Sequence, residues 1–136
     1  MRLIDTHSHL FLEEFSEDLP QVIERARSAG ITHIFMPKID STTIDSMLSV
    51  CNAYKDYCFP MIGLHPTSVD AGYEKELEIV AEELSSPDKY VAIGEIGMDL
   101  YWDKTFRKEQ ELALDKQFRL ALEYDLPVVI HCREAF

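Results

Sequence analysis

The chain has 136 residues, of which 46% are hydrophobic and 28% are charged, and its formal net charge is −12. This composition is typical of a compact globular domain and excludes an intrinsically disordered chain. An excess of 25 acidic over 13 basic side chains argues against wrapping a long duplex, but it allows one strand end to bind where metal ions supply positive charge.

Five short apolar segments, whose starts lie 28 to 37 residues apart, are predicted to be strands. Most of them are continuous hydrophobic runs, as expected for parallel strands covered on both faces. They span residues 2–5, 31–36, 59–64, 90–95 and 127–131.

Apolar residues at helical spacing predict a helix between each pair of strands. Gly30 is expected to end the first helix. The four apolar faces are Leu19, Val22, Ile23, Ala26 and Ala29; Ile44, Met47, Leu48 and Cys51; Leu77, Val80, Ala81 and Leu84; and Leu114, Phe118, Ala121 and Leu122.

Four strand–helix units followed by a fifth strand predict an α/β fold of parallel repeats with right-handed crossovers. An open doubly wound sheet and a (β/α)8 barrel both fit, and a barrel typically needs about 250 residues. The chain ends five residues after His131, before any helix that could follow the fifth strand. An isolated half barrel would leave strand edges unpaired and apolar surface exposed. We therefore expect a truncated chain, or completion of the fold by another chain.

Histidines and a glutamate stand at the predicted carboxyl ends of three strands. His7 and His9 are two positions apart, so their imidazoles point to the same side and can converge on one ion. Glu95 and His131 end two other apolar strands. A buried carboxylate there must be paired, hydrogen-bonded or bound to metal. Each residue has an ordinary structural explanation alone, but together they predict a metal site at one rim.

Four motifs, in order along the chain, resemble those of the TatD family of deoxyribonucleases. They occupy 3–10, 63–66, 94–99 and 126–135, and they read LIDTHSHL, GLHP, GEIGMD and LPVVIHCREA. The resemblance implies a TIM-type (β/α)8 barrel with a divalent-metal centre. Residues 1–136 would form the N-terminal part of this single domain, about four and a half βα units.

The resemblance also implies roles for single residues. His7 and His9 match ligands of one metal, Glu95 matches a carboxylate that bridges two metals, and His131 matches a ligand of the second. The family's remaining ligands, a His and an Asp that is also the expected general base, lie on strands beyond this chain. The catalytic base therefore stays unknown here.

Two more residues are candidates for contact with a substrate phosphate. His65, in Gly-Leu-His-Pro, matches a family position near that phosphate, although it could be an ordinary hydrogen-bonded histidine. Arg133 lies two residues past His131, and its guanidinium can pair bidentately with phosphate oxygens, unless an acidic neighbour engages it. Tyr101, Trp102 and Phe106 could stack on a base or simply cover the rim.

The predicted activity is hydrolysis of DNA phosphodiester bonds by metal-activated water, acting on a single strand or a strand end. Two ions are expected, and mixed imidazole and carboxylate ligands suit zinc, manganese or magnesium. A related phosphoesterase or deacylase, or an inactive half barrel, are the alternatives.

The chain shows no sign of export or membrane insertion. It has no apolar run of about 18 residues, and an acidic residue appears at position 5. Cys51, Cys58 and Cys132 form no CxxC pair, which favours free thiols in a reducing compartment. We expect a cytoplasmic protein without a membrane partner.

Overall fold

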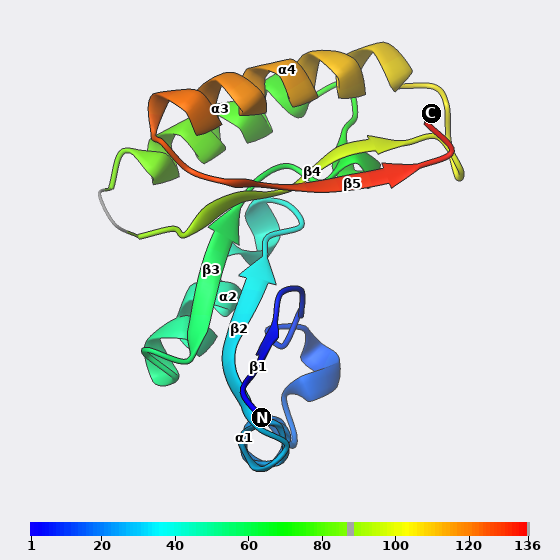
Figure 1. The fold of residues 1–136 in the computed structure, drawn as a ribbon. Helices are drawn as coiled ribbons and strands as arrows, with labels where there is room; N and C mark the ends of the chain where they lie inside the picture. Colours follow the sequence, from blue (N-terminus) through cyan, green and yellow to red (C-terminus); the bar gives the residue numbers. More distant parts are fainter. Residues whose placement is uncertain (87–88, 136) are drawn as a thin grey trace.

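The computed structural model describes residues 1–86 and 89–135. Five parallel strands pair in sequence order and form one side of a barrel (Figure 1). The strands are β1 (Leu3–Asp5), β2 (Ile31–Pro37), β3 (Cys58–Ile62), β4 (Ala92–Asp99) and β5 (Val128–Arg133). All five overlap the predicted apolar segments.

Four α-helices connect the strands: α1 (Leu19–Ser28), α2 (Ile44–Ala53), α3 (Tyr73–Leu84) and α4 (Arg107–Glu123). Three single-turn 3-10 helices, η1 (Glu13–Phe15), η2 (Ser41–Thr43) and η3 (Pro66–Ser68), lie in the loops. Figure 1 shows α3 and α4 side by side along β4 and β5. As predicted, Gly30 follows the end of α1, and its φ of +91° is one that glycine adopts without strain.

The main core lies between the sheet and its helices. Ile34 and Met36 of β2, Ile62 of β3 and Ile93 of β4 are at most 2% exposed within it. Burial of these side chains against the helices fixes the direction of the strands and therefore the position of their carboxyl ends.

Two strands are longer than predicted. β4 continues four residues past Glu95 to Asp99, and β5 continues past His131 to Arg133. The apolar pattern breaks at Glu95 and Gly97. Main-chain pairing with β5 shifts register between Ile93 and Ile96 and then continues, so that Gly97 pairs with His131 and Asp99 with Arg133. Glu95 therefore lies inside β4 and not at its end.

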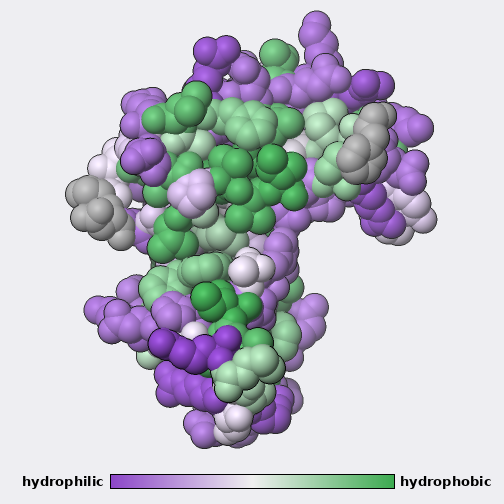
Figure 2. Space-filling view, viewed as in Figure 1, coloured by the Kyte–Doolittle hydropathy of each residue, from purple (hydrophilic) through white to green (hydrophobic). Residues whose placement is uncertain are grey.

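The predicted buried face of α4 is partly wrong. Leu122 is 84% exposed, and the buried positions of this helix are Gln110, Ala113, Gln117 and Ala121. The helix is turned so that two glutamine side chains reach strand backbone, an arrangement that hydrophobic periodicity does not reveal. Figure 2 shows hydrophobic side chains on the surface between α4 and β5, and Ile130 of β5 is 56% exposed.

The thiols agree with the sequence prediction. All three cysteines are free, with Cys51 and Cys58 buried and Cys132 exposed. Across the described ranges 1–86 and 89–135, no helix combines the length and the apolar character that a membrane crossing requires.

Candidate metal centre

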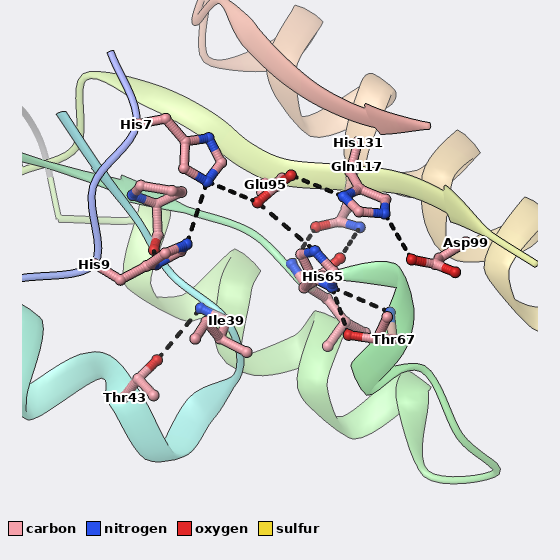
Figure 3. A network of polar contacts seen from close by, with 12 residues as sticks. His7, His9, Ile39, Thr43, His65, Thr67, Glu95, Asp99, Gln117 and His131 are labelled. Carbon is pink, nitrogen blue, oxygen red and sulfur yellow. Dashed lines mark hydrogen bonds and ion pairs between the residues drawn. The ribbon is translucent and has the colours of Figure 1, made fainter. Parts of the chain in front are cut away.

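Four histidines and a glutamate, brought from four parts of the chain, gather toward the carboxyl-terminal side of the sheet (Figure 3). His7 and His9 follow β1, His65 follows β3, Glu95 belongs to β4 and His131 to β5. Their nitrogen and oxygen atoms form two groups, in each of which the atoms lie within 4.8 Å of one another: His7, His9 and Glu95; and His65, Glu95 and His131. The structure thus brings together five of the six predicted site residues.

In the first group, Nε2 of His7 lies 3.2 Å from Nε2 of His9 and 3.2 Å from Oε2 of Glu95. The other ring nitrogen of His9, Nδ1, lies 3.1 Å from the Pro37 carbonyl oxygen. A carbonyl only accepts, so Nδ1 donates, and the neutral ring keeps a lone pair on Nε2. Burial, followed by the neighbouring His7, lowers the pKa of His9 and favours this neutral form.

In the second group, Nδ1 of His131 lies 3.0 Å from Oε1 of Glu95, and Nε2 of His65 lies 3.7 Å from Oε2. The backbone N–H of Thr67 donates to Nδ1 of His65 at 3.2 Å, so neutral His65 carries its proton on Nε2. Burial is the main cause that lowers the pKa of His65. This tautomer makes His65 a hydrogen-bond donor toward the centre of the cluster.

The cluster fits divalent ions. Ligands about 2.0–2.1 Å from one ion lie roughly 3.0–3.4 Å apart when they are neighbours in its coordination shell. The three shortest separations within the two groups, 3.0, 3.2 and 3.2 Å, fall in this range. Glu95 is 8% exposed, and its two oxygens face different histidines, as a carboxylate that bridges two ions requires. Lone pairs that face one another in a partly buried site are stabilised by a cation.

Asp99 belongs to this cluster, although the sequence prediction missed it. Its side chain is 2% exposed, and Oδ2 lies 2.8 Å from Nε2 of His131. Burial would raise the pKa of Asp99, but hydrogen bonds from the Tyr101 amide and from His131 hold it below its usual value. The signal was available: Glu95, Gly97 and Asp99 alternate along β4 and so share one face.

Two buried glutamines of α4 hold the backbone of the site. The Gln110 side chain accepts from the Asp99 N–H at 2.8 Å and donates to the Asp99 carbonyl at 3.0 Å. Gln117 makes the same pair of bonds with Leu64, at 2.6 and 3.3 Å. Because Leu64 precedes His65, α4 positions residues on both sides of the second group. Sequence reasoning missed both glutamines.

Arg133 lies apart from these two groups. Its guanidinium carbon stacks 3.7 Å from the ring centroid of Tyr101 and lies 5.4 Å from that of Trp102. Aromatic faces bind guanidinium without using its in-plane N–H donors, so Arg133 can still pair with an anion at its edge.

Comparison with known proteins supplies the context for this geometry. The family model described as "TatD related DNase" matches residues 4–136. An uncharacterized metal-dependent hydrolase of Bacillus subtilis is 38% identical over 98% of this chain and 51% of its own length. A 3'-5' ssDNA/RNA exonuclease TatD of Pantoea ananatis is 32% identical over the same shares. The chain thus spans about half the length of the curated relatives it matches.

A solved structure confirms the predicted fold. The crystal structure of a TatD homologue, YJJV of Escherichia coli, matches with a TM-score of 0.89 and 36% identity. The match covers 98% of this chain and 51% of that one. The five strands and four helices therefore correspond to part of a TIM-type barrel.

Proposed function

The chain belongs to the TatD-related DNase family, and on that premise we propose that it contributes to the metal-dependent hydrolysis of phosphodiester bonds in single-stranded nucleic acid. The observation that carries the proposal is the position of Glu95, whose two oxygens face separate histidines. We assign His7, His9 and Glu95 to one ion, and Glu95 and His131 to a second. Bound divalent ions supply a lowered pKa for an attacking water and neutralise charge on the phosphate.

His65 and Arg133 are proposed to orient the phosphate. The Thr67 amide leaves the His65 proton on Nε2, which suits donation to a phosphate oxygen better than metal ligation. Arg133 presents the in-plane donors of a guanidinium whose face is occupied by Tyr101. Both residues then contact substrate directly, while the ions are held by the other four.

The substrate is proposed to be a DNA strand or a strand end. One of the relatives is named as a single-stranded DNA and RNA exonuclease. A net charge of −12 limits the area that can face phosphates, which favours a short bound segment. Free thiols fit a reducing compartment and support our proposal of a cytoplasmic location.

The test measures both the metal content of the protein and its activity on three substrates. Purified full-length protein is analysed for bound metal, and labelled single-stranded DNA, a small phosphomonoester and an ester are assayed side by side. We expect two ions per chain, turnover of the DNA, and loss of both in Glu95→Gln. Glu82→Gln, an exposed glutamate on α3, is the matched control.

A different hydrolase of the same metal-dependent class is the second candidate. The relative with 38% identity is named only as a metal-dependent hydrolase. The same ligands would serve phosphomonoesters or acyl substrates. Turnover of the small substrates with none of the DNA overturns the nuclease proposal, and metal-independent turnover overturns the metal centre as well.

A further inference from the structure

A small pocket opens beside the metal centre, between η3 and the loop that joins β4 to α4. Its volume is about 210 Å³, enough for one planar heterocycle and too small for a base pair. Pro66, Val69, Trp102 and Phe106 supply its apolar walls. The size and lining suit a small, largely apolar ligand.

Two residues that line the pocket are hydrogen-bonded to residues of the candidate metal centre. Thr67 lines the pocket, and its Oγ1 lies 2.7 Å from Nδ1 of His65. Gln110 lines it too, and this side chain holds the backbone of Asp99, which in turn contacts His131. A ligand in the pocket therefore contacts Thr67, the hydrogen-bond partner of His65, and Gln110, the side chain that holds the Asp99 backbone.

Trp102 is exposed in a way that simple packing does not explain. It is 74% exposed, and it is the chain's only tryptophan. The neighbouring Tyr101 packs edge-to-face against it, with ring centroids 4.7 Å apart at 90°. Arg133 stacks on Tyr101 in turn. A wide aromatic face held in this way and left open to solvent is a stacking platform.

The charge on the pocket lining favours a base over a phosphate as the ligand. Asp103 lines it, and its carboxylate accepts a hydrogen bond from the Thr105 amide. A carboxylate repels phosphate but accepts hydrogen bonds from the amino groups of adenine, guanine or cytosine. Arg133, the nearby cation, lies outside the pocket against Tyr101 and is free to meet the backbone.

We propose that this pocket binds one nucleobase of the substrate strand, stacked on Trp102, while Arg133 contacts an adjacent phosphate. The inference rests on the proposed function, because it takes a nucleic-acid strand as substrate. Base stacking orients the strand so that the linkage next to the bound base reaches His65 and His131. The site binds a strand with bases more tightly than an abasic strand, and it favours bases with an amino group.

Fluorescence of Trp102 tests the proposal without requiring turnover. The metal-loaded chain is titrated with a short phosphorothioate single strand, whose linkages resist hydrolysis, and with a strand of equal length that lacks the bases. We expect the intact strand to quench Trp102 and to bind about 5-fold or more tightly than the abasic one, because stacking is lost.

Variants connect this preference to the pocket. Trp102→Ala, followed by a fluorescent label on the strand, should bind intact and abasic strands equally. Tyr124→Ala, which removes an exposed aromatic at the far end of α4, should keep the wild-type preference. An absence of quenching by the intact strand, equal affinity for both strands in the wild type, or an unchanged preference in Trp102→Ala overturns the pocket.

The same experiments separate this inference from the proposed hydrolysis. Base-dependent quenching without any cleavage of unmodified DNA would leave the pocket in place and remove the nuclease function. Cleavage that does not depend on Trp102 or on the bases would keep the function and remove the pocket.

Discussion

Nε2 of His131 donates a hydrogen bond to Oδ2 of Asp99 at 2.8 Å, on the edge of the ring opposite the nitrogen that faces Glu95. In the neutral ring, this bond leaves Nδ1 with the lone pair that a metal ion needs. Asp99 is itself fixed by the Tyr101 amide and by Gln110. It therefore positions His131.

Asp99→Asn should weaken metal binding by about 10- to 100-fold, because an amide can turn its NH2 toward Nε2 and favour the wrong tautomer. Titration against a chromophoric chelator measures the affinity directly. Asp103→Asn, an exposed aspartate four residues away, removes the same charge without touching His131 and should change little. Equal effects of the two variants would show that charge alone matters.

Gln117→Leu should lower the free energy of unfolding by about 2–4 kcal/mol, because it leaves the buried N–H and carbonyl of Leu64 without their hydrogen-bond partner. Urea unfolding measures the loss. Gln21→Leu, the same change at an exposed position of α1, should stay within about 0.5 kcal/mol. A loss at Gln117 no larger than at Gln21 would mean that these two hydrogen bonds do not contribute to stability.

Gly97 permits the close approach of β4 and β5 beside the site. A Cβ there would lie 1.8 Å from the His131 carbonyl oxygen, and its φ of +149° disfavours any other residue. Gly97→Ala should therefore cost at least about 2–3 kcal/mol of stability and displace His131.

Thermal unfolding with and without metal separates the two effects of this change. The variant should lose stability in both conditions and gain less from added metal than the wild type gains. Gly72→Ala, where the nearest atom is a movable Asp70 oxygen at 3.2 Å, is the control and should change stability by under about 1 kcal/mol. Full stabilisation of Gly97→Ala by metal would show that His131 keeps its place.

The order and type of the elements followed from the sequence because burial on both faces produces continuous apolar strands. The extension of β4 to Asp99 could not be predicted, because this part of the strand has no apolar pattern. It is a strand because its main chain pairs with β5. The face of α4 was misjudged at Leu122 for a related reason. Gln110 and Gln117 are buried, and each makes two hydrogen bonds to the backbone of another segment. A prediction from hydrophobic periodicity treats glutamine as a surface residue.

The convergence of His7, His9, Glu95 and His131 was predictable, since the carboxyl ends of parallel strands share one edge. The hydrogen-bond partners that orient the histidine rings were not predictable. The acceptor for His9 is the Pro37 carbonyl, and the donor to His65 is the Thr67 amide, both of them backbone groups that a residue pattern does not report. These contacts set the tautomers, so that Nε2 of neutral His9 carries a lone pair and Nε2 of neutral His65 carries a proton.

The two buried thiols make the free energy of unfolding depend on pH, and the direction of the change can be predicted. Burial raises the pKa of Cys51 to about 12 and that of Cys58 to about 11. In the unfolded chain, thiols ionise near pH 8.5. Above that pH the unfolded state releases protons that the folded state keeps, so the free energy of unfolding must fall as pH rises.

Under reducing conditions we expect a loss of about 3–4 kcal/mol between pH 8 and pH 10, and little change below pH 8, where both states hold most of the protons. The double variant Cys51→Ala, Cys58→Ala should be less stable at pH 8 but flatter between pH 8 and 10. Cys132→Ala, which removes an exposed thiol, should follow the wild-type slope. Parallel curves for the wild type and the double variant would show that the pH dependence arises elsewhere, since tyrosines begin to ionise near pH 10.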